Sequence, residues 1–216
     1  MDTVITVVGI GPGHPDYVLP AAKSAIEQAK VLVGGRRVLA DFARKEQKTM
    51  TITGDIPATL DFIRQNLRDN DVTVLVSGDP GYYSLLDVLK KNFPPEKIRV
   101  IPGISSVQMA FARLALPWHH ATLLSFHGRS PAAEDLRFAP EKILGLLTDN
   151  EHNSRYVAAQ LLEEGWPEDS ACYICRRLSY EDESISAATL GEALTLAPVG
   201  SAVLVVTAAK PAKIIP

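Results

Sequence analysis

Three short segments rich in glycine and proline have the composition of ligand-binding turns. They are Gly9–Gly13 (GIGPG), Ser77–Gly81 (SGDPG) and Pro102–Ser106 (PGISS). Glycine lets a backbone approach a ligand closely, and proline fixes φ near about −65°. Each segment directly follows a predicted strand, and the carboxyl ends of parallel strands share the sheet edge where α/β proteins bind ligands. The turns therefore predict one cleft, which is uncharged apart from Asp79.

The first of these turns departs from a dinucleotide-binding loop. A Rossmann loop needs a third glycine where this chain has His14, and Pro12 and Pro15 lack the N–H donors that would hold a pyrophosphate. A Walker lysine is also missing from the segment. A tight turn between strand and helix is therefore an alternative to a ligand-binding loop, as an ordinary β-turn is for Ser77–Gly81.

Cys172 and Cys175 have the CxxC spacing of metal-binding and redox motifs. A zinc site needs about four ligands, and the chain has no second CxxC and no HxxxH. Redox dithiols lie at helix starts, whereas these cysteines lie in an apolar strand and point to opposite faces. We predict buried structural thiols and no metal site. For His119 and His120, a solvated or capping role is favoured over metal ligation.

The overall composition is that of a globular protein with a sizeable core. Of 216 residues, 46% are hydrophobic and 22% charged, and the net charge of −3 gives no reason to expect binding to nucleic acid. No uninterrupted apolar segment approaches the roughly 20 residues of a membrane helix. The start of the chain has no basic region typical of a signal peptide. We expect a soluble, cytoplasmic protein without a membrane segment.

In the first half, apolar β-branched segments alternate with helical patterns, which favours a parallel sheet covered by helices. The strongest predicted strand is VTVLV, and Asp55 is a predicted helix N-cap. The predicted strands are Thr3–Ile10, Lys30–Val33, Met50–Ile52, Val72–Val76 and Ile98–Ile101. The predicted helices cover residues 21–29, Arg37–Ala43, 55–67, Leu85–Lys91 and 104–114.

The pattern breaks at Leu116–Trp118, so we predict two α/β domains, residues 1–116 and 117–216. Consecutive strands late in the chain favour a mixed sheet in the second. His127 and Arg129 follow its first strand and are expected to face a cleft between the domains, with a surface loop as the alternative. The predicted elements are strands at Ala121–Phe126, Lys142–Leu147, Ala171–Arg176, Ser184–Thr189 and Ser201–Thr207, and helices at Asn153–Glu164 and Leu190–Leu196.

Taken together, these segments resemble the S-adenosylmethionine-dependent tetrapyrrole methyltransferases of cobalamin and sirohaem biosynthesis. The resemblance covers the whole chain in order. The motifs are GIGPGHPDYVLPAA at 9–22, VSGDPGYYS at 76–84, PGISSVQMAFARLALPW at 102–118, LLTDNEHNSRYVAAQLLEEG at 146–165 and CRRLSYEDESI at 175–185. The SFHGR, LTD and LSY segments resemble the corresponding segments of the family branch that methylates carbon 5 of cobalt-precorrin-7. Arg176 and Arg177 stand where relatives often carry Glu-Asn.

The resemblance implies a tetrapyrrole methylase fold, with S-adenosylmethionine in the cleft between the two domains and S-adenosylhomocysteine as its product. The N-terminal domain would hold the parallel sheet and the C-terminal domain the mixed one. Pro12 would line the methyl-donor site, and Leu147 and Leu178 would contact the adenine through their main chains. The ribose, methionine and amino-acid parts would be held by Ser77, Gly78, Asp79, Tyr82, Ser105 and Ser106.

The implied substrate is a corrinoid with many carboxylates, and its methylation needs no metal because the sulfonium donor is already activated. Arg129 and Arg113 could bind these carboxylates with paired hydrogen bonds. His127 is the candidate acid or base, since imidazole exchanges protons readily near neutral pH. The resemblance also suggests a homodimer, and a separate partner protein for the carbon-15 methylation and decarboxylation.

Two other classes of function remain open from the residues. Other members of the family methylate a different corrin carbon, uroporphyrinogen III or a modified histidine on a protein. A non-catalytic nucleotide-binding module is a further alternative, in which Arg36 would contact a 2′-phosphate. The missing third glycine of the first turn argues against that alternative.

Overall fold

The computed structural model describes residues 3–211, which form two compact units divided between Ser105 and Ser106. The predicted domains, 1–116 and 117–216, differ from these units by one helix, α5 (Ser106–Arg113). This helix packs on strands β7 (Ile143–Leu147) and β10 (Val203–Thr207) of the second unit. The chain therefore passes from one unit to the next at the start of α5.

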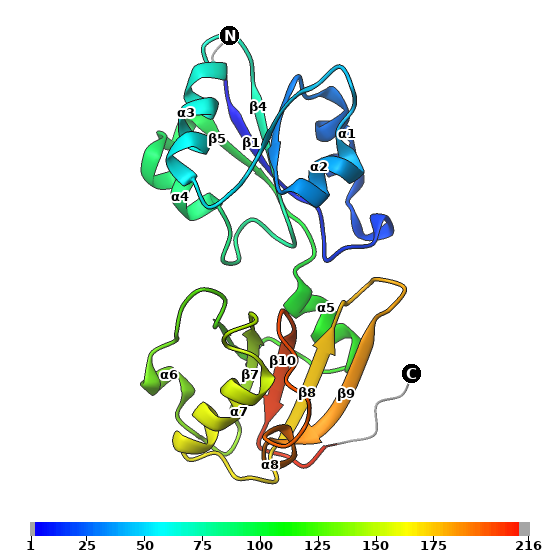
Figure 1. The fold of residues 1–216 in the computed structure, drawn as a ribbon, viewed down its shortest axis with the longest axis vertical. Helices are drawn as coiled ribbons and strands as arrows, with labels where there is room; N and C mark the ends of the chain where they lie inside the picture. The colour runs from blue at the N-terminus through cyan, green and yellow to red at the C-terminus, as the bar shows by residue number, and fades with distance from the viewer. Residues whose placement is uncertain (1–2, 212–216) are drawn as a thin grey trace. The chain divides into compact units, whose positions relative to one another are not determined.

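The first unit is built on a five-stranded parallel sheet in the order β3-β2-β4-β1-β5 (Figure 1). All of its pairings are parallel, as predicted. Every residue of β4 is buried, which explains its continuous apolar sequence. The strands are β1 (Ile5–Gly9), β2 (Val31–Gly34), β3 (Lys48–Thr51), β4 (Val72–Val76) and β5 (Ile98–Ile101).

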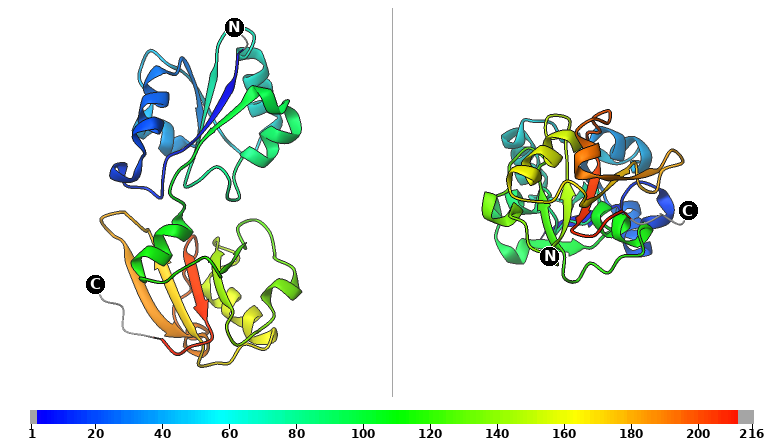
Figure 2. Two further views of the ribbon diagram at one scale, coloured as in Figure 1. Left: turned by 180° about the vertical axis from the view of Figure 1, so that it is seen from behind. Right: turned by 90° about the horizontal axis from the view of Figure 1, so that it is seen from below.

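Helices cover both faces of this sheet (Figures 1 and 2). On one face α1 (Pro20–Gln28) and α2 (Arg36–Phe42) pack on one set of strand residues. On the other face α3 (Ile56–Asn66) and α4 (Leu86–Asn92) pack on the alternate set. Asp55 caps α3 by accepting a hydrogen bond from the Ala58 N–H at 3.0 Å, which confirms that prediction.

The second unit contains a mixed five-stranded sheet in the order β6-β7-β10-β8-β9, as expected. Strands β6 and β7 pair in parallel, and the other neighbours are antiparallel. The remaining strands are β6 (Thr122–Ser125), β8 (Ala171–Arg176) and β9 (Ser184–Thr189).

The second sheet is also covered on both faces. Leu144 and Leu146 pack toward α7 (Ser154–Glu163) and α8 (Leu190–Ala193), while Gly145 between them faces α5. A Cβ on Gly145 would lie 2.9 Å from the Phe111 ring, so glycine gives α5 its close approach. Residues 127–140, expected to be a loop, contain the short helix α6 (Ala133–Leu136). Two 3-10 turns, η1 (Pro15–Tyr17) and η2 (Pro95–Lys97), lie in the first unit.

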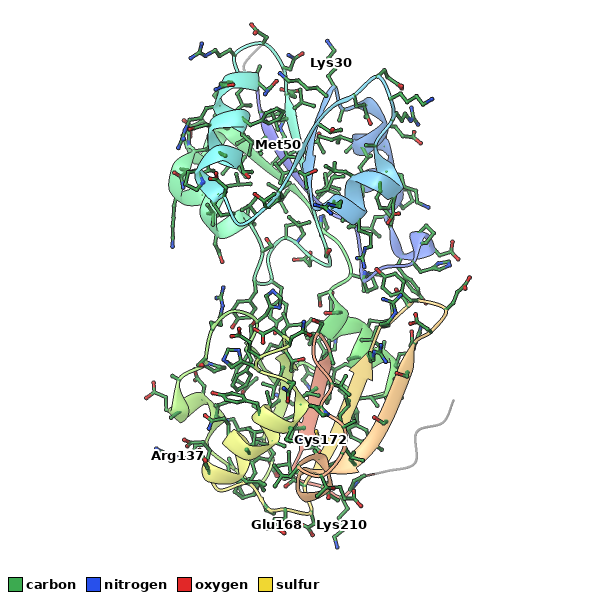
Figure 3. The ribbon with its side chains drawn as sticks, in the orientation of Figure 1. Lys30, Met50, Arg137, Glu168, Cys172 and Lys210 are labelled. Atoms are coloured by element: carbon green, nitrogen blue, oxygen red, sulfur yellow. The ribbon has the colours of Figure 1, made fainter. Side chains whose placement is uncertain are left out.

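Both cysteines are free and buried, as predicted for structural thiols. Cys172 lies among the strands of the second sheet (Figure 3). Burial raises the pKa of each thiol to about 12, so both stay protonated at neutral pH. Among the described residues, no helix combines the length and apolar character that crossing a bilayer requires.

Candidate functional site

Three loops meet at the carboxyl edge of the first sheet, where the turns rich in glycine and proline were expected. Strands β4, β1 and β5 are neighbours, so the segments that follow them lie side by side. The Gly78 N–H donates to Gly11 O at 2.8 Å, and the Gly11 N–H donates back to Gly78 O at 3.3 Å. The loops after β1 and β4 are thus joined through their backbones.

The glycines of this edge allow the three loops to pack directly on one another. A Cβ on Gly103 would lie 2.2 Å from Gly78 O, and a Cβ on Gly9 would lie 2.6 Å from Gly103 N. Gly78 also has a φ of +68°, which favours glycine. The sequence assigned these glycines to the approach of a ligand, whereas the contacts in the structure are between backbone and backbone.

Asp79 joins the loop after β4 to the loop after β5. Its Oδ1 accepts the Gly81 N–H at 2.7 Å, and its Oδ2 accepts the Gly103 N–H at 3.0 Å. Both carboxylate oxygens are therefore used to hold backbone groups. A carboxylate can accept about four hydrogen bonds, so these two contacts leave further acceptor capacity.

The other first-unit candidates lie on the same three loops. Pro12 is half-buried and Ser77 is exposed. Tyr82 is half-buried, and its ring meets that of Tyr83 edge to face with 4.8 Å between centroids. Burial, and secondly the neighbouring Tyr83, raises the pKa of Tyr82 well above its usual range, so its hydroxyl remains a hydrogen-bond donor.

Ser105 and Ser106 complete this set at the last of the three turns. Ser105 is buried, and Ser106 is the first residue of α5. The two serines therefore stand at a helix start.

The first turn is followed by a 3-10 turn rather than by the helix of a Rossmann loop. His14 Nδ1 accepts the Asp16 N–H at 3.3 Å, which caps η1, and α1 begins only at Pro20. The amino end of a helix is therefore not placed next to the Gly9–Gly13 turn, where a pyrophosphate would need it. This geometry disfavours a dinucleotide and suits a ligand without phosphate.

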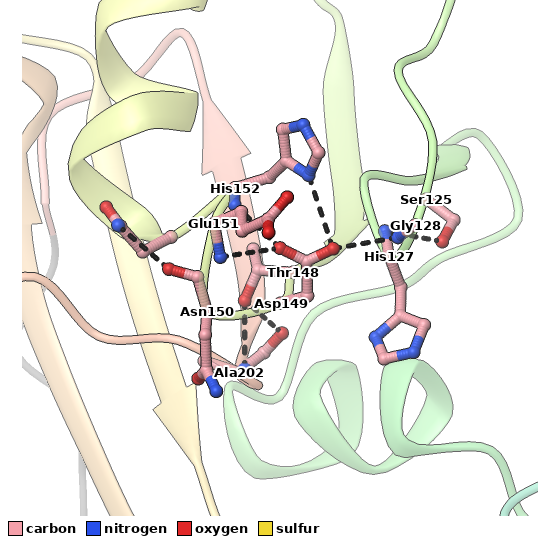
Figure 4. Close-up of polar contacts among 10 residues, drawn as sticks. Ser125, His127, Gly128, Thr148, Asp149, Asn150, Glu151, His152 and Ala202 are labelled. Carbon is pink, nitrogen blue, oxygen red and sulfur yellow. Dashed lines mark hydrogen bonds and ion pairs between the residues drawn. The ribbon is translucent and has the colours of Figure 1, made fainter. Parts of the chain in front are cut away.

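In the second unit, Asp149 gathers polar groups at the carboxyl ends of β6 and β7 (Figure 4). Its carboxylate accepts the Gly128 N–H at 2.7 Å and the His152 N–H at 2.6 Å. These hydrogen bonds, that of Gly128 first, hold the pKa of Asp149 far below its usual range. Asp149 is therefore ionised at neutral pH.

His127 and Arg129 are exposed on the loop that Asp149 holds. The His127 N–H donates to Ser125 Oγ at 3.1 Å, and its imidazole points away from Asp149 (Figure 4). Gly128 between them has a φ of +65°, and an added Cβ there would meet nothing within 4 Å. Glycine at this position thus serves the turn and not close packing.

Arg113, a predicted substrate contact, is paired with a carboxylate of its own unit. Its Nε lies 2.7 Å from Glu183 Oε1, and Glu183 Oε2 accepts the Ser179 N–H at 2.5 Å. Burial alone would raise the pKa of Glu183, but Arg113 and Ser179 more than offset this and lower it. These contacts brace the turn in which Arg177 and Ser179 have φ of 48° and 71°.

The two residues expected to contact adenine lie in different surroundings. Leu178 is buried on the braced turn. Leu147 is half-buried at the end of β7, and its carbonyl accepts the Phe126 N–H at 2.8 Å. The structure thus commits the Leu147 carbonyl to the chain itself.

The family profile for tetrapyrrole (corrin/porphyrin) methylases matches residues 4–194. The chain belongs to this family. Within residues 3–211, no group of three or more histidine, cysteine or acidic side chains is gathered as a metal site would require. The family match identifies the chain as a methyltransferase.

Relatives and solved structures extend the match over most of this tetrapyrrole methylase. It is 37% identical over 162 residues to a cobalt-precorrin-7 C(5)-methyltransferase of Salmonella typhimurium, covering 75% of this chain and 79% of the relative. It is 32% identical over 198 residues to a probable enzyme of that name from Methanocaldococcus jannaschii, covering 88% and 90%. The uroporphyrin-III C-methyltransferase of Thermus thermophilus, solved with S-adenosylhomocysteine, has the same fold, with a TM-score of 0.73, 21% identity and coverage of 94% and 92%.

Two residues that organise this methylase's second unit were not predicted as functional. Asp149 ends the LTD segment directly after a strand, which is a position where a carboxylate can cap loops and helix starts. Glu183 lies in an acidic segment, EDE at 181–183, and nothing in the sequence separates it from its exposed neighbours. Each also has a partner from a distant segment, Gly128 for Asp149 and Arg113 for Glu183, which only the structure shows.

Proposed function

We propose that this protein is an S-adenosylmethionine-dependent C-methyltransferase of cobalamin biosynthesis that methylates carbon 5 of cobalt-precorrin-7. The observation that carries the proposal is the sequence identity of 37% and 32%, over 75% and 88% of the chain, to two relatives that bear this name. The SFHGR, LTD and LSY segments support the same branch. The solved structures share the fold at lower identity and carry no weight on the substrate.

The carboxyl edge of the first unit suits S-adenosylmethionine as donor. This cofactor has no phosphate, and the loops here offer neither a helix start at the first turn nor a Walker lysine. Ser77, Asp79 and Tyr82 bring a hydroxyl, a carboxylate and a phenol to the same loops, the polar types that a ribose and a methionine part require. When bound, the cofactor supplies a methyl group on a sulfonium, which needs no further activation.

The chain's own contribution to the first unit's site is alignment. Packed glycines and the Asp79 bridge fix the three loops against one another, which keeps Pro12 and Gly78 in place. Holding two reactants in line is worth about 7–11 kcal/mol at best. We propose that Ser105 and Ser106 hold the amino-acid part and that Leu147 and Leu178 contact the adenine.

The second unit supplies the charged groups that a corrinoid with many carboxylates requires. We assign carboxylate binding to Arg129, which is exposed on the loop after β6. Once the new C–C bond has formed, the macrocycle must lose a proton. His127 is exposed, and we propose that it accepts this proton. We further propose a cytoplasmic homodimer that works with a separate carbon-15 enzyme.

The proposal is tested by incubating the protein with S-adenosylmethionine and cobalt-precorrin-7. We expect one added methyl group by mass, placed on carbon 5 by carbon-13 labelling of the donor methyl and NMR. Methylation at another carbon, or of uroporphyrinogen III instead, would move the protein to another branch of the family. Binding of NADPH without methyl transfer would contradict the proposal altogether.

A further inference from the structure

We propose that Asp149 is a positioning residue for the methyl acceptor, because its carboxylate ties the 126–129 loop (Phe126–Arg129) to the start of helix α7. The inference rests on the proposed function, since the acceptor is the ligand that this loop would bind. It concerns a side chain with no expected contact to donor or acceptor, which acts through the loop that it holds.

The tie is made by a single side chain that accepts hydrogen bonds from two separate segments (Figure 4). Asp149 Oδ1 accepts the N–H groups of Glu151 at 2.9 Å and His152 at 2.6 Å. Asp149 Oδ2 accepts the Gly128 N–H at 2.7 Å, from a residue 21 positions earlier in the chain. Oδ1 therefore faces the turn before α7, and Oδ2 faces both the 126–129 loop and the His152 ring.

His152 strengthens the side of the tie that belongs to α7. Its Nδ1 lies 3.2 Å from Asp149 Oδ2, and its ring meets that of Tyr156 edge to face at 4.9 Å. Phe126, the first residue of the loop, is fully buried and lies within 6.2 Å of both rings by centroid distance. The base of the loop is thus packed, and Asp149 fixes its next turn.

Beyond Phe126, the backbone of the loop is held at His127 and Gly128. The His127 N–H donates to Ser125 Oγ at 3.1 Å, and Gly128 has the φ of +65° that a tight turn needs. His127 and Arg129, the groups that we assign to the acceptor, are exposed on either side of Gly128. The Gly128 hydrogen bond therefore fixes the turn from which both side chains project.

An amide cannot replace this carboxylate, although it has nearly the same shape. Asparagine offers one oxygen acceptor, and its NH2 group only donates. In Asp149→Asn the oxygen can satisfy the N–H donors of Glu151 and His152, which turns the NH2 group toward the Gly128 N–H, so that donor faces donor. The substitution should release the loop and leave the start of α7 intact.

The test compares Asp149→Asn with Asp169→Asn, a change at a surface aspartate of the same unit that pairs with exposed Lys210 at 3.4 Å. Hydrogen exchange read on peptides across 126–136 should show the Gly128 amide losing about 10-fold or more of its protection in Asp149→Asn alone. The KM for cobalt-precorrin-7 should rise about 10-fold, while the KM for S-adenosylmethionine stays within about twofold. A purely structural role would move both KM values or neither.

Ser125→Ala serves as the second variant if Asp149→Asn does not fold. It removes the acceptor of the His127 N–H and should raise the acceptor KM in the same direction by a smaller factor. Unchanged exchange at Gly128 in Asp149→Asn, or a released loop with an unchanged acceptor KM, would overturn the inference. A wild-type protein that methylates no corrinoid would overturn the proposed function, and the exchange comparison would then show separately whether the tie exists.

Discussion

The loops at the carboxyl edge of the first unit and the 126–129 loop of the second unit are held by different means. In the first unit, Gly9, Gly78 and Gly103 pack backbone on backbone, and a Cβ would lie as little as 2.2 Å from a carbonyl oxygen. In the second, a Cβ on Gly128 would meet nothing within 4 Å, and one carboxylate makes the tie. The same residue type thus serves packing in one place and a turn in the other.

The difference suggests a division of tasks between the two units. Where loops pack backbone on backbone, their amino-acid sequence can change little, which suits a ligand that is the same throughout the family, such as the methyl donor. A loop tied by one side chain can change its sequence and its reach, which suits an acceptor that differs between branches of the family. The following substitutions test whether the loops of the two units are held by these different means.

The largest effect is expected from Gly103→Ala. The added Cβ would force Gly78 and Gly9 apart, so we expect a loss of about 1–3 kcal/mol in the free energy of unfolding and about 100-fold weaker binding of S-adenosylhomocysteine. Chemical denaturation and calorimetry measure these two quantities. Gly54→Ala is the matched control, because a Cβ there meets nothing within 4 Å. Equal behaviour of the two variants would refute the packing argument.

A smaller loss is expected from Asp79→Asn. Both carboxylate oxygens accept backbone N–H groups, so the amide must turn its NH2 group toward Gly81 or Gly103. Binding of S-adenosylhomocysteine should weaken about 10-fold. Asp41→Asn, a change at an exposed residue of α2, is the control. Full donor affinity in Asp79→Asn would show that the loops stay together without the bridge.

In the second unit, Arg129→Ala and Arg113→Ala should separate binding from bracing. Arg129→Ala should raise the KM for the corrinoid about 10-fold without changing donor affinity. Arg113→Ala removes the partner of Glu183 and should lower the free energy of unfolding by about 0.5–1 kcal/mol, with a smaller change in the acceptor KM. Steady-state kinetics and denaturation curves decide the matter. If Arg113→Ala raised the KM for the corrinoid more than Arg129→Ala does, Arg113 would be assigned to substrate binding after all.

The smallest effect is expected from thiol reagents. Burial raises the pKa of Cys172 and Cys175 to about 12, so neither thiol should react with iodoacetamide at pH 8 unless the second unit unfolds. Intact mass measured with and without denaturant reads this directly. Rapid labelling of the native protein would show that the second sheet opens readily around β8.

Much of the fold could be predicted because the strands are strongly patterned. Val72–Val76, Ile98–Ile101, Ala171–Arg176 and Ser184–Thr189 match their predicted limits residue for residue. Helix α6 was not predicted, because its single apolar anchor, Leu136, gives no helical period.

The sequence also suggested that the first unit would end with α5, since the break in pattern comes after that helix. The apolar face of α5 carries no sign of which sheet it covers. Val107 and Phe111 pack on Gly145, a contact between segments far apart in the chain. The position of this helix was therefore a matter of tertiary packing.

The parts of the candidate site that depend on neighbouring residues in the sequence could be predicted, and the parts that depend on contacts between distant segments could not. The three turns could be found because each combines glycine and proline directly after a strand. Asp149 could not, because Gly128, the donor that makes the tie, lies 21 positions away on a segment that only the fold brings close. The pairing of Arg113 with Glu183 escaped for the same reason.

The most direct test of the division between the units is calorimetric titration of S-adenosylhomocysteine into the wild type, Gly103→Ala and Asp149→Asn. We expect tight binding by the wild type, about 100-fold weaker binding by Gly103→Ala, and wild-type affinity in Asp149→Asn. NADPH serves as the control ligand and should not bind. Loss of binding in Asp149→Asn with retention in Gly103→Ala would contradict the account, because it would place the donor on the side-chain-tied loop.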